Sequence, residues 1–196
     1  MRVAFALLVD ETAHNTLRKW ALDAHRRFRT GFLAAQLPPH VSLKQPFPVH
    51  DLAAIEAYFD RFATTLAPVS ITLTQLDVRH TSLSPRDEHV ILWADVKETP
   101  DLRAMHERLN VELSSQFGDT AASFDGPAYH FHAIVSIAMH PYGTHQAMRQ
   151  EYAATRIAYT FVATHLALFY YDDDSFAPAS YITYKIARVG PPHPDL

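Results

Sequence analysis

The sequence has no cysteine among its 196 residues, so a disulfide framework, a thiolate metal ligand and a cysteine nucleophile are all excluded. Only five glycines occur, and no glycine-rich stretch resembles the loops that cradle nucleotide phosphates. No apolar run approaches the roughly 20 residues that span a bilayer, so we expect no membrane association. The apolar run at the N-terminus is too short, and its flank too weakly basic, for a signal peptide. We therefore expect a cytoplasmic protein.

Positive charge is also scarce, because the formal net charge is −4. A long nucleic-acid surface is normally strongly basic, so we expect none here. A single RNA end or a small nucleotide needs far fewer positive groups and remains a possible substrate. Hydrophobic residues make up 48% of the chain and charged residues 19%, which is typical of a globular protein. We expect one domain over residues 1–196, and a monomer.

Hydrophobic periodicity divides the chain into alternating strands and helices. Apolar residues at helical spacing predict four helices, which begin near Asp10 or Thr12, at Asp51, at Thr99 and near Thr144. The first helix is expected to stop at Gly31 and the third at Gly118. Short apolar or alternating runs predict strands over 3–9, 38–44, 69–76, 89–96, 129–138, 159–171 and 181–189.

The order of these elements is roughly doubled, because each half of the chain contains a helix, a histidine-bearing strand, a second helix and further strands. This order predicts an α+β fold with two pseudo-symmetric lobes. Each lobe would hold a mainly antiparallel sheet flanked by helices, and the active-site cleft would lie between the lobes.

The first histidine strand lies in the sequence PPHVSLKQPFP. Side chains alternate along a strand, so His40 and Ser42 share one face while Val41 and Leu43 share the other. Lys44 follows, and we expect it to be a solvated lysine at the sheet edge. This pattern alone is typical of any half-buried strand.

The second histidine strand is YHFHAIVSIA, and it lies about half the chain away from the first. In a regular strand His130, His132, Ile134 and Ser136 would share a face. An approximate two-fold relation would bring His40 and His132 into one cleft from opposite sides. Two imidazoles that titrate near neutrality suit transfer at phosphorus, since one removes a proton while the other donates one. The hydroxyl of Ser42 could then hold a phosphate oxygen. This chemistry requires no metal and no cofactor.

The run from His40 to Phe47 resembles the first signature of the two-histidine (2H) phosphoesterases, which include 2′-5′ RNA ligase-like proteins and RNA 2′,3′-cyclic phosphodiesterases. The family signature is His, an apolar residue, Ser or Thr, and an apolar residue, once in each lobe. The resemblance covers essentially the whole chain. It implies a bilobal α+β fold and catalysis by His40 and His132, with Ser42 on the phosphate. The implied reaction opens a 2′,3′-cyclic phosphate, or cleaves or forms a 2′-5′ phosphodiester, at an RNA end or in a small nucleotide.

The second copy of the signature departs from the family pattern, because Ile134 stands where a hydroxyl residue is expected. We choose His132 as the second catalytic histidine, with His130 as the alternative. His130 or Ser136 would supply the missing contact to the substrate.

Two other interpretations of the histidine strands stay open. His130 and His132 are two residues apart and suit a metal-dependent hydrolase, although no further ligand is placed beside them. The chain would alternatively be a non-catalytic module that binds a nucleotide or an RNA end. Most of the other histidines, His106 and His145 among them, lie in predicted helices, loops or the tail and are expected to be solvated.

Overall fold

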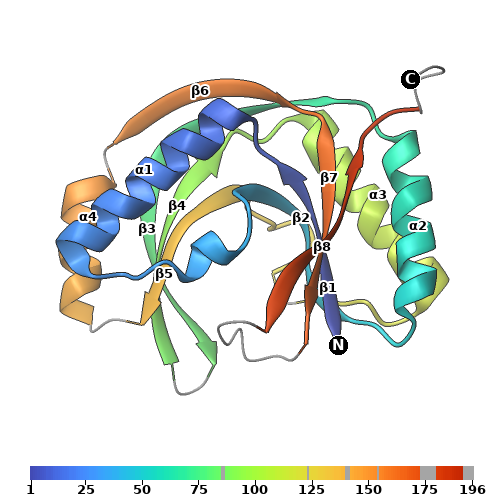
Figure 1. Ribbon diagram of the computed structural model, residues 1–196, viewed down its shortest axis with the longest axis horizontal. Helices are drawn as coiled ribbons and strands as arrows, with labels where there is room; N and C mark the ends of the chain where they lie inside the picture. Colours follow the sequence, from blue (N-terminus) through green and yellow to red (C-terminus); the bar gives the residue numbers. More distant parts are fainter. Residues whose placement is uncertain (85–86, 123, 140–141, 154, 173–179, 192–196) are drawn as a thin grey trace.

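The computed structural model describes residues 1–84, 87–122, 124–139, 142–153, 155–172 and 180–191 (Figure 1). Its strands are β1 (Arg2–Leu8), β2 (His40–Pro48), β3 (Val69–Ser84), β4 (Asp87–Val96), β5 (His132–Met139), β6 (Arg156–Ala163), β7 (His165–Tyr171) and β8 (Tyr181–Arg188). Its helices are α1 (Glu11–Phe28), the short 3-10 helix η1 (Leu33–Gln36), α2 (Leu52–Thr65), α3 (Pro100–Phe117) and α4 (Tyr142–Tyr152). None of the helices in these ranges is long and apolar enough to cross a lipid bilayer.

All eight strands form one antiparallel sheet in the order β6-β3-β4-β5-β2-β1-β7-β8. The α+β class and the antiparallel sheet flanked by helices are therefore confirmed. The two expected sheets are the two halves of this single sheet. They meet where β5 lies beside β2, so the two histidine strands are central neighbours.

The helices divide between the two halves, with α1 and α4 on the β3–β5 side and α2 and α3 on the β2–β8 side (Figure 1). Two of these helices, however, cross over, because each joins two strands of one half of the sheet but packs on the other half. Helix α1 joins β1 to β2 yet contacts β5 of the other half, and α3 joins β4 to β5 yet contacts β2. Each half of the sheet is thus covered by one helix whose preceding and following strands both lie in the opposite half.

The main core lies between the sheet and the helices. In the half that contains β1, the buried ring of Phe5 packs against Phe47, Tyr58 and Phe59 at centroid distances of 6.4, 6.0 and 5.7 Å. Full burial of one such side chain contributes about 1.5–3 kcal/mol. A smaller cluster on the opposite face of the sheet includes Phe169 of β7, and it borders the first histidine strand.

Helix starts follow the predicted caps. The carboxylate of Asp10 accepts from the backbone N–H of Ala13 at 2.7 Å, and Asp51 and Thr99 cap α2 and α3 in the same way. Gly118 ends α3 with a φ of 78°, as predicted. The prediction that Gly31 ends α1 was wrong, because Arg29 adopts the left-handed conformation and its N–H bonds to His25.

The predicted strand over 159–171 is two strands. The chain breaks at Thr164, after which β6 forms one edge of the sheet and β7 pairs with β1 in the other half. Continuous apolar and aromatic residues on both sides of the break concealed it. Most of the loop that separates β7 from β8 lies outside the described residues.

Candidate active site

In the ladder of the sheet, the two histidine strands are paired at one position, Val41 of β2 opposite Ala133 of β5. Both residues are fully buried on the helix-covered face. Their neighbours along each strand therefore point to the opposite face, which places His40 and His132 on one side of the sheet. The two histidines flank the Val41–Ala133 pair diagonally, a relation in which residues typically lie about 7–8 Å apart.

Ser42 and Ile134 occupy corresponding positions beside this same pair. Each follows a histidine by two residues on the same face of its strand. No group in the described residues bonds to the Ser42 hydroxyl, which leaves it available to a phosphate oxygen. Ile134 is half-buried and offers no donor. The site therefore has a hydroxyl on one side of its approximate two-fold axis and an aliphatic side chain on the other.

Both strands carry a bulge immediately after this motif. In β2 the register against β1 skips Leu43, so that Lys44 lies opposite the buried Phe5. In β5 the register against β4 skips Val135, so that Ser136 lies opposite the buried Leu92. A bulge of one residue reverses the side-chain alternation beyond it.

These bulges overturn two expectations. Ser136 lies on the helix-covered face, 4% exposed, and not on the face of His132 as predicted from regular alternation. It is therefore removed from the candidate substrate contacts. Lys44 is 1% exposed instead of solvated, and its ammonium is paired with Asp125 and bonded to Asn110 Oδ1 at 2.8 Å.

The two histidine rings are anchored in the same way. His40 Nδ1 donates to the carbonyl of Pro38 at 2.8 Å, and His132 Nδ1 donates to the carbonyl of His130 at 2.8 Å. Each carbonyl belongs to the residue two positions earlier. Because a carbonyl can only accept, Nδ1 keeps its proton and Nε2 is the nitrogen available for proton transfer.

Both imidazoles are held neutral at pH 7. Burial lowers the pKa of His40 to about 4, and burial also lowers the pKa of His132 to about 4. The bonds to the backbone carbonyls raise both values and only partly offset burial. A positive charge on His132 further lowers the pKa of His40, which couples the two rings electrostatically.

The surroundings of the two rings differ. Phe169 meets the His40 ring edge-on at 4.5 Å, while Trp93 of β4 stacks on His132 at 4.3 Å. The guanidinium of Arg18 acts on His40 and lowers its pKa. The carboxylate of Asp95 acts on His132 and raises its pKa.

Asp95 is held by three side chains. Trp93 Nε1 donates to Oδ1 at 2.8 Å, His130 Nε2 donates to the same oxygen at 2.9 Å, and Gln75 Nε2 donates to Oδ2 at 3.3 Å. His130 is thus engaged with a carboxylate, and its ring lies 6.1 Å from that of His132. This geometry fits His132 better than His130 as the counterpart of His40.

The metal-dependent interpretation concerns the same two histidines, His130 and His132. His132 Nδ1 and His130 Nε2 are both occupied by hydrogen bonds. In the part of the chain that the structure describes, no three side chains of the metal-binding types come close enough to share an ion. A test for metal ligands would begin with Asp95 and His130, because both lie beside His132.

Sequence reasoning missed Trp93, Asp95 and Phe169 as neighbours of the histidines. Trp93 and Asp95 are two apart on a predicted strand and could have been paired with each other, but nothing in the sequence placed that strand beside His132. Two histidines expected to be solvated are buried. His106 is 1% exposed and donates to the carbonyl of Leu43 at 2.7 Å, and His145 is 8% exposed.

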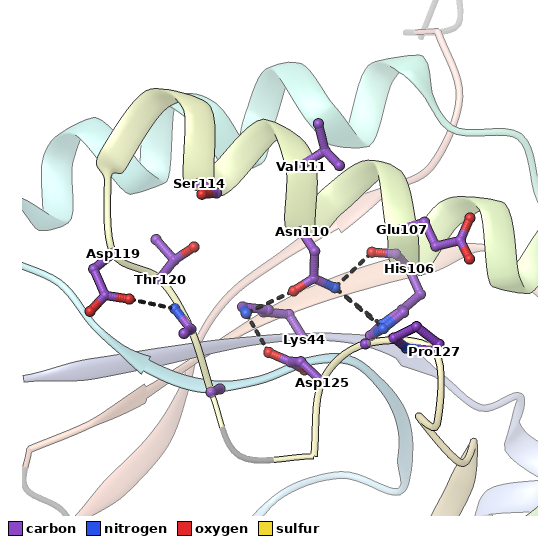
Figure 2. Close-up of a pocket in the computed structure, with 13 residues that line it drawn as sticks. Lys44, His106, Glu107, Asn110, Val111, Ser114, Asp119, Thr120, Asp125 and Pro127 are labelled. Carbon is purple, nitrogen blue, oxygen red and sulfur yellow. Dashed lines mark hydrogen bonds and ion pairs between the residues drawn. The ribbon is translucent and has the colours of Figure 1, made fainter.

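A pocket of about 630 Å³ lies on the other side of the sheet from the histidines, between α3 and the segment that leads from it toward β5 (Figure 2). Lys44, Asn110 and Asp125 converge on it, and His106 lies beside them (Figure 2). The pocket therefore lies behind the site and does not open onto the imidazoles. Residues that line it contact β2 behind Ser42.

Known proteins resemble this chain in both sequence and fold. The sequence pattern of the 2′-5′ RNA ligase superfamily matches residues 9–175. The chain belongs to this superfamily. No curated protein matches it by sequence. Membership agrees with the His40 signature, and it identifies the chain as a relative of the two-histidine phosphoesterases.

Solved structures of low sequence identity share the fold of this superfamily member. TT0787 of Thermus thermophilus has a TM-score of 0.64 at 15% identity, with 98% of this chain and 100% of that chain covered. Usb1 of Kluyveromyces marxianus has a TM-score of 0.58 at 11% identity, with 96% of each covered. LigT of E. coli in complex with 3′-AMP has a TM-score of 0.56 at 16% identity, with 96% and 97% covered.

Proposed function

We propose that the protein is a metal-independent phosphoesterase that opens a 2′,3′-cyclic phosphate, or cleaves a 2′-5′ phosphodiester, at an RNA end or in a small nucleotide. One observation carries the proposal. His40 and His132 share a face of the sheet, and each presents Nε2 because its Nδ1 is bonded to the carbonyl two residues before it. Membership of the 2′-5′ RNA ligase superfamily supports the same chemistry.

In the proposed reaction, Nε2 of one imidazole takes a proton from a water molecule as the water oxygen bonds to phosphorus. The bond from phosphorus to the 2′- or 3′-oxygen breaks, and the second imidazole, which enters protonated, gives its proton to that oxygen. Ser42 donates to a non-bridging oxygen and holds the phosphate in line. One proton is taken up and one is released, so the histidine pair as a whole keeps its charge.

A nucleotide substrate is also supported by what related folds bind. LigT of E. coli has been solved with 3′-AMP and with ATP, and Usb1 of Kluyveromyces marxianus with uridine monophosphate. A net charge of −4 favours a terminal phosphate over a long nucleic-acid strand. We therefore take a 2′,3′-cyclic mononucleotide as the first substrate to test.

The test measures hydrolysis of 2′,3′-cyclic mononucleotides in the presence of EDTA. We expect the wild type to turn over and His40→Ala and His132→Ala each to lose about 10²–10⁴ in kcat, the usual contribution of one general acid or base. His130→Ala is the matched control, since it removes a nearby imidazole that is bonded to Asp95, and it should lose far less.

Three outcomes would contradict the proposal. Activity lost in EDTA and restored by zinc or manganese would indicate a metal-dependent hydrolase. Nucleotide binding without detectable hydrolysis would indicate a binding module, and Ile134 in the second motif makes this a specific alternative. Abolition by His130→Ala alone would assign the second catalytic role to that histidine.

A further inference from the structure

The seam between the two catalytic strands is weakly hydrogen-bonded. Strand β2 pairs with β1 from His40 to Pro48, and β5 pairs with β4 from His132 to Met139. Among the described residues, β2 and β5 share the single ladder pair Val41–Ala133. The backbone ladder therefore fixes each histidine within its own half. Other contacts must set how far apart the two halves stand.

Tyr129 makes such a contact. It directly precedes the second histidine strand, and its hydroxyl donates to the carbonyl of Ser42 at 2.9 Å. The same hydroxyl accepts from Gln45 Nε2 at 3.1 Å. The side chain is 4% exposed, and burial raises the pKa of the phenol, so the hydroxyl stays protonated and remains a donor. One side chain thus ties the segment before His132 to the strand that carries Ser42.

The Tyr129 ring and backbone are themselves held from both sides. His106 of α3 stacks on the ring at 4.3 Å with an interplanar angle of 17°. Arg103 of α3 donates to the carbonyl of Tyr129 at 2.7 Å and to that of Gly126 at 3.2 Å. Helix α3 therefore holds both the ring and the backbone of Tyr129, and His106 in turn is bonded to the carbonyl of Leu43 on β2.

The segment before Tyr129 is anchored a second time, at the pocket behind the sheet. The carboxylate of Asp125 pairs with the buried ammonium of Lys44 (Figure 2). The same ammonium donates a hydrogen bond to Asn110 Oδ1. Lys44 reaches this side of the sheet only because the bulge at Leu43 turns it inward. Both anchors thus attach to β2 at or just after Ser42.

We propose that Tyr129 is a positioning residue that sets the spacing of the two halves of the active site, with the Lys44–Asp125 pair as its support. The proposal rests on the proposed function, because it concerns the distance over which the two histidines act on one phosphate. A merely structural tyrosine would stabilise the fold without affecting that distance. Misplacement of a reacting group by about 1 Å can lower a rate by about 10²-fold.

The test compares Tyr129→Phe with Tyr58→Phe. Tyr58 is a matched control because it is equally buried and its hydroxyl donates to Glu112 at 2.9 Å, in the contact between α2 and α3. We expect both variants to lose similar thermal stability. Only Tyr129→Phe should lower kcat on a 2′,3′-cyclic mononucleotide, by about 10- to 100-fold, with KM changed by less than about 3-fold.

A second measurement does not need activity. Histidine side-chain resonances are followed by NMR as the pH is changed, and a loosened seam admits water to the rings. The apparent pKa of His132 should therefore rise toward its ordinary value in Tyr129→Phe but not in Tyr58→Phe. If the wild type turned out to be inactive on cyclic nucleotides, the proposed function would fail while this measurement still tested the spacing.

Asp125→Asn removes the charge of the supporting pair and should act in the same direction with a smaller loss of kcat. Asp119→Asn is its control, because Asp119 lines the same pocket and, among the described residues, its carboxylate accepts from the nearby backbone N–H of Ala121 and not from Lys44. Unchanged kcat and unchanged histidine titration in Tyr129→Phe would overturn the proposal.

Discussion

At His40 and His132, hydrogen bonding and burial act on different properties of the ring. The Nδ1 bond to the backbone selects the tautomer and leaves Nε2 for chemistry. Burial disfavours the imidazolium and keeps both rings neutral in the free protein. A phosphate between the rings is negatively charged and would raise both pKa values, so substrate binding itself would favour loading the acid with its proton.

The lowered pKa values predict how stability changes with pH. In the unfolded chain a histidine has a pKa of about 6.5 and takes up a proton below it. The folded protein does not bind that proton until the pH approaches about 4. Protons therefore favour unfolding in this window, and the stability contributed by the neutral rings is present above pH 6.5 and is lost as the pH falls toward 4.

We expect the free energy of unfolding, measured by urea titration, to fall between pH 7 and pH 4.5. The fall should be shallower in the double variant His40→Gln/His132→Gln, which has no ring to protonate. Carboxylates titrate in both proteins and cancel in the comparison. Equal slopes in the two proteins would show that the rings are not held neutral by the fold.

Replacement of Ile134 by a hydroxyl residue is expected to strengthen phosphate binding. Ile134→Thr keeps a β-branched side chain and places a hydroxyl across from His40, on the same face of the sheet as Ser42. One new hydrogen bond contributes about 0.5–1.5 kcal/mol, so the inhibition constant for inorganic phosphate should fall by about 2- to 10-fold. Ile137→Thr, on the same strand and paired with Ile91, is the control and should leave it unchanged. The same change in both variants would contradict a phosphate contact at residue 134.

At the scale of an element, the two bulges decide which side chains belong to the site and which support it from behind. The bulge in β2 buries a full ion pair, with the Lys44 side chain 2% and the Asp125 side chain 11% exposed. Two buried charges are tolerated because each neutralises the other, and removing one leaves its partner unpaired.

A double-mutant cycle tests this pair. Lys44→Met should lower the free energy of unfolding by about 3–5 kcal/mol, because it leaves the Asp125 carboxylate without a counter-charge. The double variant Lys44→Met/Asp125→Leu should lose less than the sum of the single variants, by about 1–3 kcal/mol. Strict additivity in chemical denaturation would mean that the two charges do not depend on each other.

The same bulges mark the limit of prediction from sequence. The pattern around His40 and Ser42 was sufficient to place both on one face, because that part of β2 is regular. Nothing in the sequence signals the extra residue at Leu43 or Val135, so Lys44 and Ser136 were assigned to the wrong environments. A one-residue insertion reverses the side-chain alternation up to the next irregularity, which in β2 comes before Phe47.

At the scale of the whole molecule, the doubled order of elements predicted the α+β class and two lobes whose histidine strands face one cleft. It did not predict that the two sheets join, since the joint is the single pair Val41–Ala133. It also did not predict the crossed helices. Periodicity shows which face of a helix is buried but not which half of the sheet covers it.

Crossed helices should make the protein unfold as one unit. Both tryptophans, Trp20 on α1 and Trp93 on β4, lie in the half that contains β3–β5, so tryptophan fluorescence reports on that half. Far-UV circular dichroism reports on all helices. We expect the two signals to give the same urea midpoint. Two separate transitions would show that the halves are independent despite their shared connections.

The crossing of α1 and α3 also affects how an ancestral form of such a protein could have functioned. A chain with one histidine strand and one crossing helix would have needed a second copy, since its helix would lie on the partner's sheet and its imidazole would face the partner's across a symmetry axis. In a single chain each side is free to change separately. Ser42 follows His40 by two residues while Ile134 follows His132 by two, and Asp95 is paired with His132. A symmetric pair of identical chains could not have carried such differences.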